Sequence, residues 1–135
     1  MDEMITQHVD LDLDDHGMIA TSKKGIKLHY GKGHDEFSPV ELLVTSIAGC
    51  SFGVLRIILE NRKITYDDIH VDIDYDMVDE KPQRVVAVRI HFYVKNPSAD
   101  IDVMGRVLNQ TIKSCPVIQS VKGSIEVNEQ LTITA

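Results

Sequence analysis

The chain lacks a cluster of basic residues. Its 14 Lys and Arg residues are scattered along 135 positions and are outnumbered by 21 Asp and Glu, so that the formal net charge is −7. A surface that binds nucleic acid needs concentrated positive charge to neutralise phosphates. We therefore expect no nucleic-acid partner.

The N-terminus lacks the features of a targeting signal. Met1, Asp2 and Glu3 stand where a signal peptide has its basic region, and no apolar segment follows them. We expect no apolar segment that approaches the ~18 residues of a membrane span. These absences predict a cytoplasmic protein with no membrane partner.

Cysteine is scarce, since Cys50 and Cys115 are the only two. In a reducing compartment such a pair is seldom a structural disulfide, and a pair that cycles usually serves catalysis or sensing. The six histidines are dispersed, without a His-x-x-x-His spacing or a cysteine neighbour, so no metal site is expected. Apolar residues make up 43% of the chain, which predicts a single domain over residues 1–135 with a core of its own.

The spacing of apolar residues predicts the secondary structure. Alternation predicts strands over residues 9–14, 18–21, 26–30, 69–77, 86–94 and 125–134, with the fourth and fifth forming a long antiparallel hairpin. A helical period predicts helices over residues 39–62, capped by Ser38, and 99–115. Pro116 then begins a short helical piece that Gly123 closes. Because strands and helices do not alternate strictly, the fold class is α+β.

Each cysteine lies on the apolar stripe of a predicted helix. The first of these helices is apolar around most of its circumference, which predicts burial on more than one side. If the two helices pack face to face, Cys50 and Cys115 come within disulfide reach, with Cα atoms about 4.4 to 6.8 Å apart. The alternative is that both are inert core residues, because free cysteine is often buried.

The immediate neighbours of the cysteines favour reactivity. Gly49 beside Cys50 leaves room for an oxidant to reach the sulfur. Cys115 would lie at the N-terminal end of the helical piece that starts at Pro116, where unpaired amides and the helix dipole favour thiolate over thiol.

Three segments carry recognisable motifs: Ser38 to Leu43 reads SPVELL, Ala48 to Ser51 reads AGCS, and Ser114 to Val117 reads SCPV. Together with the loop at residues 31–33 and the tail at residues 121–127, they resemble the OsmC/Ohr family of osmotically inducible and organic hydroperoxide resistance proteins. The resemblance runs from about Gly31 to the C-terminus, while the first thirty residues match only in general character.

This resemblance implies an OsmC-like fold in an intertwined homodimer, with antiparallel sheets packed on a long central helix and a second, kinked helix. It implies that Cys50 is the peroxidatic cysteine that reduces organic hydroperoxides in oxidative-stress defence, and that Cys115 is the resolving cysteine. No cofactor is implied, because an external dithiol would reduce the resulting disulfide. We expect an apolar substrate site lined by Leu43, Ile47, Phe52 and Val54.

Two positions depart from the family pattern. Members carry a glutamate directly after the proline and an arginine from the N-terminal strands, whereas here Val40 follows the proline and no arginine precedes Arg56. Glu41 is the nearest acid, but it lies about 180° around the helix from Cys50. We expect it to cap the helix, with a catalytic role as the alternative. Positive charge at the site would have to come from Lys23, Lys24 or Lys27.

Two other functions stay open from the sequence. One is a catalytically weak OsmC-like protein that binds a hydrophobic ligand or senses redox state, which the two departures favour. The other is a structural domain with idle core cysteines, which predicts no reaction with peroxide and no intramolecular disulfide.

Overall fold

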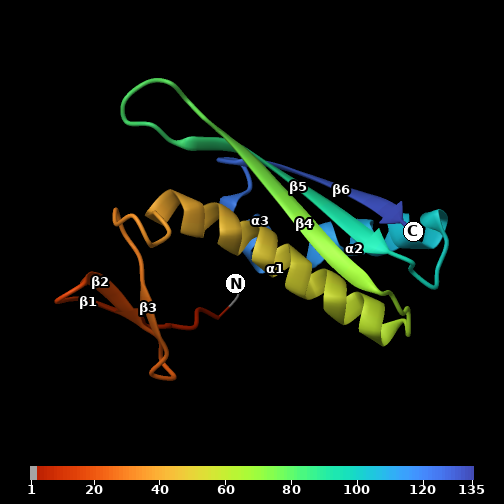
Figure 1. The fold of residues 1–135 in the computed structure, drawn as a ribbon, viewed down its shortest axis with the longest axis horizontal. Coiled ribbons are helices and arrows are strands. Elements are labelled where there is room, and N and C mark those ends of the chain that lie inside the picture. The colour runs from red at the N-terminus through yellow and green to blue at the C-terminus, as the bar shows by residue number, and fades with distance from the viewer. Residues whose placement is uncertain (1–2) are drawn as a thin grey trace. The chain divides into compact units, whose positions relative to one another are not determined.

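Within residues 3–135, which the computed structural model describes, the chain forms two three-stranded sheets and three helices (Figure 1). The chain divides into a first unit that ends at Leu42 and a second unit from Leu43 to Ala135, each with one of the sheets. The α+β class expected from the sequence is confirmed. The single-domain organisation stays a prediction.

The first unit is an antiparallel meander of β1 (Asp10–Asp14), β2 (Gly17–Thr21) and β3 (Lys27–His29). Asp14 ties it together, because its carboxylate accepts a hydrogen bond from the backbone N–H of His16 at 2.8 Å and lies 2.6 Å from Nε2 of His29. The three predicted strands are confirmed to within two residues at each end. The candidate lysines are exposed in this unit, and their role stays a prediction: Lys23, Lys24 and Lys27.

The second unit is built on the order β4 (Asp68–Met77), β5 (Val85–Lys95) and β6 (Glu126–Thr134). β4 and β5 pair in antiparallel fashion, which confirms the predicted hairpin, and β6 runs parallel to β5. The helices are α1 (Pro39–Asn61), which starts in the first unit, α2 (Ile101–Ser114) and α3 (Pro116–Val121). Pro116 lacks an N–H and begins α3, so α2 ends as the sequence predicts.

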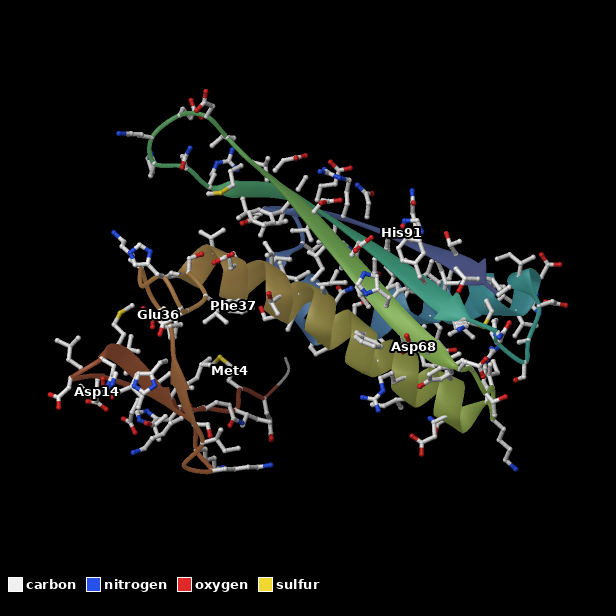
Figure 2. All side chains as sticks on the ribbon, viewed as in Figure 1. Met4, Asp14, Glu36, Phe37, Asp68 and His91 are labelled. Carbon is white, nitrogen blue, oxygen red and sulfur yellow. The ribbon has the colours of Figure 1, made fainter. Side chains whose placement is uncertain are left out.

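One face of the second sheet forms the core. The inward residues of β5 are fully buried, as are those that α1 and α2 contribute: Val88, Ile90, Phe92, Val94, Ile47, Leu55, Leu59, Met104 and Val107. The opposite face is polar and carries Asp68 and His91 (Figure 2). The alternation of apolar and polar residues along the strands therefore gives the sheet one buried face and one solvent-facing face.

α1 differs from expectation in two respects. Its inner side is buried, but within one chain Ile57 is 58% exposed and Leu43 is 38% exposed, so burial on more than one side is not observed. By length and composition α1 is also apolar enough to cross a membrane, which contradicts the expectation that no stretch approaches this limit. The exposed apolar side of α1 and its membrane-like composition have one cause. A helix that is apolar on its core side and also on a side that the single chain leaves uncovered has the overall composition of a membrane span.

Candidate functional site

The two cysteines meet in the second unit. Cys50 lies in the middle of α1 and is partly buried, while Cys115 is completely buried at the junction of α2 and α3. Both are free thiols, and their side chains are close enough for Cys50 to raise the pKa of Cys115. The expected approach of the two sulfurs is thus observed, and the catalytic roles assigned to Cys50 and Cys115 stay predictions.

The environment of Cys115 favours its protonated form. Burial raises the pKa of the Cys115 thiol, and the neighbouring Cys50 thiol raises that pKa further. The backbone amides of Ile118 and Val117 lower this pKa, although the Cys115 side chain makes no cap hydrogen bond to α3. The amides at the start of α3 thus favour the thiolate of Cys115 as expected, but desolvation outweighs the amides of this six-residue helix, and the pKa of Cys115 is raised overall.

Cys50 is flanked by open space along α1. A Cβ built on Gly49 or on Gly53 would meet no atom within 4 Å, so neither neighbouring turn crowds the sulfur. The room that the sequence predicts at Gly49 is therefore present. Within residues 3–135, no group of three or more His, Cys, Asp or Glu side chains is arranged to hold a metal ion.

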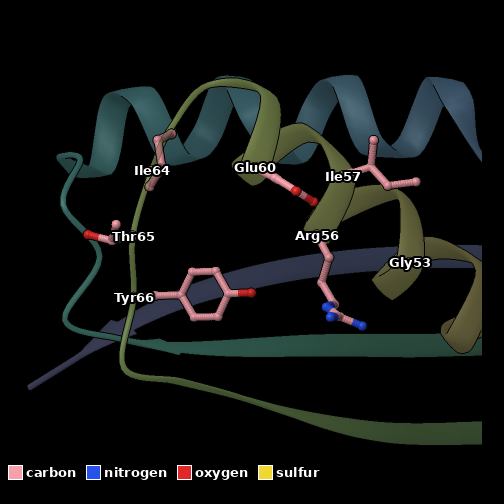
Figure 3. A pocket seen from close by; sticks show the side chains of 7 residues that line it. All are labelled: Gly53, Arg56, Ile57, Glu60, Ile64, Thr65 and Tyr66. Atoms are coloured by element: carbon pink, nitrogen blue, oxygen red, sulfur yellow. The ribbon is translucent and has the colours of Figure 1, made fainter.

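A hollow of about 590 Å³ begins one turn beyond Cys50. Gly53 and Ile57 follow Cys50 by three and seven residues, which places them on the same side of α1. The Arg56 and Tyr66 side chains extend into this space (Figure 3). The hollow is lined by Gly53, Arg56, Ile57, Glu60, Ile64, Thr65 and Tyr66.

This lining replaces part of the predicted one. Ile47 is fully buried in the core, and Phe52 packs edge-on against Phe92 with ring centroids 6.2 Å apart. Both point to the inner side of α1 because the sheet supplies apolar partners there. Of the four predicted lining residues, Leu43 is exposed, Val54 and Phe52 are partly buried, and Ile47 is buried.

Glu41 caps α1. Its Oε1 accepts a hydrogen bond from the backbone N–H of Ser38 at 2.9 Å, and Oγ of Ser38 accepts one from the N–H of Glu41 at 3.1 Å. This reciprocal pair is a capping box. The expected capping role is confirmed, and a catalytic role for Glu41 stays a prediction.

Removing the cap should weaken the fold without changing the thiols. Ser38→Ala and Glu41→Ala should each lower the free energy of unfolding by about 1 kcal/mol, because each leaves a helix N-terminal N–H unpaired. Urea unfolding measures this loss. Alkylation of Cys50 by iodoacetamide tests the other role, since a rate that falls more than about tenfold in Glu41→Ala alone would place Glu41 in the active site.

A second polar pair, not found from the sequence, adjoins Cys50. The Ser51 hydroxyl, completely buried, donates a hydrogen bond to Oε1 of Glu129 on β6. The other oxygen, Oε2, is buried and has no hydrogen-bond partner among residues 3–135. Burial raises the pKa of Glu129, and the Ser51 hydrogen bond partly opposes this. The signal in the sequence is a charged residue between Val127 and Leu131, where the alternation of the strand calls for an apolar one.

The raised pKa makes Glu129 a source of pH-dependent stability. A carboxyl whose pKa is higher in the folded chain contributes stability below its unfolded pKa and loses it as pH rises through the folded value. Glu129→Gln should therefore be about as stable as the native protein near pH 4 and about 1 kcal/mol more stable at neutral pH, since the amide resembles the protonated acid. Urea unfolding at both pH values measures the difference, and equal stabilities at neutral pH would contradict it.

Comparison with known proteins gives the context of this site. A family model described as OsmC-like protein matches residues 31–130. Among curated proteins, no sequence matches the chain. A solved structure of a hypothetical protein from Aquifex aeolicus VF5 is similar, with a TM-score of 0.83 and 19% identity over 97% of this chain and 98% of that one.

Two other solved structures carry more specific names. An OsmC-like protein from Mycoplasma pneumoniae has a TM-score of 0.81 and 14% identity, covering 100% of both chains. The organic hydroperoxide resistance protein OhrB of Bacillus subtilis has a TM-score of 0.65 and 17% identity over 95% of this chain and 98% of that one. Identities this low show a shared fold alone. The family model covers most of the chain and includes both cysteines, so the chain belongs to the OsmC-like protein family.

Proposed function

We propose that the protein is a cysteine-based peroxidase that reduces organic hydroperoxides in cytoplasmic defence against oxidative stress. The observation that carries the proposal is the contact between a partly exposed thiol, Cys50, and a buried thiol, Cys115. Family membership supports it, as do similar folds named organic hydroperoxide resistance proteins in Legionella pneumophila and Bacillus subtilis.

The two thiols divide the reaction between them. The Cys50 thiolate attacks the terminal oxygen of ROOH, the O–O bond breaks, and the alkoxide leaves as ROH after taking a proton, which makes Cys50 a sulfenic acid. The Cys115 sulfur then attacks the Cys50 sulfur, a disulfide forms, and water leaves with the Cys115 proton. An external dithiol reduces this disulfide. The raised pKa of Cys115 disfavours its thiolate, so Cys115 does not compete with Cys50 for peroxide in the first step.

The hollow that begins at Gly53, one helical turn beyond Cys50, supports a substrate with a hydrocarbon part. Ile57, Ile64 and the ring of Tyr66 present apolar surface to the hollow, and Ile57 lies two helical turns beyond Cys50. A hydroperoxide with a bulky apolar group gains free energy by covering this surface, whereas hydrogen peroxide does not. We infer a preference for organic hydroperoxides.

The test is turnover of the full chain with cumene hydroperoxide. Without reductant, each chain should consume one equivalent and form the Cys50–Cys115 disulfide, which mass spectrometry detects as a loss of two hydrogens. With a dithiol such as dihydrolipoamide, consumption should continue, and cumene hydroperoxide should react faster than hydrogen peroxide. Absence of turnover with every dithiol tried would refute the proposal.

We further infer that a second copy of the chain covers α1. Leu43, Cys50 and Ile57 lie seven residues apart and form one line on the helix surface, which the single chain leaves partly exposed. Two apolar side chains on an uncovered line next to a reactive thiol are suited to a symmetric interface.

Ile57→Asp should therefore convert a dimer into a monomer, since the interface would have to bury a carboxylate without a partner. Sedimentation velocity measures the change. Ile101→Asp is the matched control, because Ile101 is 57% exposed on α2 and lies away from that line. A native protein that sediments as a monomer, or an Ile57→Asp protein that stays dimeric, would contradict the interface.

The departures from the family pattern favour a second function, a redox sensor or binder of apolar ligands with weak catalysis. Val40 occupies the position of the family's glutamate, and no arginine precedes Arg56. This function predicts negligible peroxide consumption by the native protein together with binding of an apolar fluorescent dye that Cys50→Ser retains. Rapid peroxide consumption by the native protein would exclude it.

A further inference from the structure

The hydrogen bond between Ser51 and Glu129 joins two distant parts of the second unit. Ser51 directly follows Cys50 in α1, and Glu129 lies in the middle of β6 beside the buried Ile90 of β5. Polar groups among apolar side chains cost free energy unless they are paired, and one oxygen of Glu129 has no hydrogen-bond partner in the described part of the chain. Two apolar residues at these positions would therefore cost less free energy to bury than this polar pair does.

Ser51 behaves differently from other hydroxyls in the helices of this chain. Four of these bond back to a carbonyl of their own helix, as helical serine and threonine commonly do: Ser46, Thr111, Ser114 and Ser120. Ser51 instead donates its proton across to another element. Its hydrogen bond therefore fixes the position of α1 relative to the sheet, which a bond within the helix does not do.

One of the two elements joined by this bond carries Cys50, and the other packs against the helix that ends at Cys115. α1 carries Cys50, one residue before Ser51. β6 follows α3, whose N-cap is Cys115, and α2, which ends directly before Cys115, packs on β6. A displacement of α1 along β6 would move the sulfur of Cys50 away from that of Cys115.

We propose that Glu129 is a positioning residue for the thiol pair: by accepting the Ser51 hydrogen bond, it holds the α1 turn that bears Cys50 in the place where the two sulfurs meet. The biological use of this positioning rests on the proposed peroxidase function. The geometry itself applies to any oxidation of the pair. A small misplacement of reacting groups has a large effect on rate, so the closure of the disulfide is the step that should respond.

Closure can be measured without a peroxide. Cys50 attacks the aromatic disulfide dithiobis(nitrobenzoate), which forms a mixed disulfide and releases one thionitrobenzoate. The Cys115 sulfur then attacks the Cys50 sulfur, the Cys50–Cys115 bond forms, a second thionitrobenzoate leaves, and the Cys115 proton passes to the buffer. The absorbance of the second release gives the rate of closure, and that of the first gives the intrinsic reactivity of Cys50.

In the full chain, Glu129→Ala and Ser51→Ala should slow the second release about tenfold relative to the first, because the turn that bears Cys50 is no longer held. Glu129→Gln should remain within about threefold of the native rate, since its amide oxygen still accepts the Ser51 hydrogen bond. Ser120→Ala is the matched control, because its exposed hydroxyl bonds only to its own helix, and it should close at the native rate.

Two outcomes would overturn the proposal: closure at the native rate in both alanine variants, or closure in Glu129→Gln as slow as in Glu129→Ala. Thermal unfolding identifies variants that fail to fold. If Glu129→Ala fails to fold, the closure rates of Ser51→Ala and Glu129→Gln still test the proposal. Because the assay uses no peroxide, an inactive peroxidase does not alter its reading. Likewise, if both alanine variants close the disulfide at the native rate, the positioning proposal fails even when the native protein consumes peroxide normally.

Discussion

Cys50→Ser should reduce cumene hydroperoxide consumption by at least about 1,000-fold, because a serine hydroxyl is not ionised at neutral pH and does not attack a peroxide bond. The site offers no replacement nucleophile, since the neighbouring thiol of Cys115 is completely buried and its pKa is raised. The measurement is peroxide consumption with saturating dithiol. Residual activity within tenfold of the native rate would show that Cys50 is not the nucleophile.

Cys115→Ser is the informative companion. Cys50 is still partly accessible in this variant, so it should consume one equivalent of peroxide at close to the native rate and then stop as the sulfenic acid. Dimedone trapping followed by mass spectrometry detects that acid. If Cys115→Ser instead loses the first equivalent as well, Cys115 acts before the disulfide step, and the assignment of roles is wrong.

The sequence predicted the local elements well because each depends on neighbouring residues. The hairpin of β4 and β5 follows from alternation, and the end of α2 follows from the missing N–H of Pro116. The parallel pairing of β6 with β5 depends on contacts between residues far apart in the sequence, and the alternation of apolar and polar residues within a strand does not determine its partner or direction. The exposure of Ile57 was missed for a similar reason, since periodicity shows that a surface is apolar but not whether the same chain covers it.

At the candidate site, the sequence predicted which residues meet but not how their environment acts on them. The approach of Cys50 and Cys115 follows from their places on two apolar stripes. The raised pKa of Cys115 depends on the balance between burial and the amides of α3, and that balance is set by packing. Glu129 was overlooked because a single acidic residue in a strand is usually assigned to the solvent side.

Leu55→Ala should produce the largest loss of stability, about 2 to 5 kcal/mol, which is the usual range when a fully buried leucine is truncated. Leu55 has no exposed surface and lies on the inner side of α1, one turn beyond Ser51. Its removal leaves a cavity under the part of the helix that presents Cys50. Urea unfolding with an unchanged slope and a lower midpoint would measure the loss.

The control for this cavity is Ile101→Ala. It truncates a large aliphatic side chain to alanine as Leu55→Ala does, but at a position on α2 that is 57% exposed. Its expected cost is within about 0.5 kcal/mol, since surface substitutions seldom exceed that value. A domain of this size commonly has only about 5 to 15 kcal/mol of total stability, so the Leu55→Ala loss is large enough to populate states in which α1 is detached. Disulfide closure in Leu55→Ala should then fall as urea is added well before closure falls in the native chain. If Leu55→Ala and Ile101→Ala instead unfold at the same urea concentration, the inner side of α1 does not form the core that holds Cys50 in place.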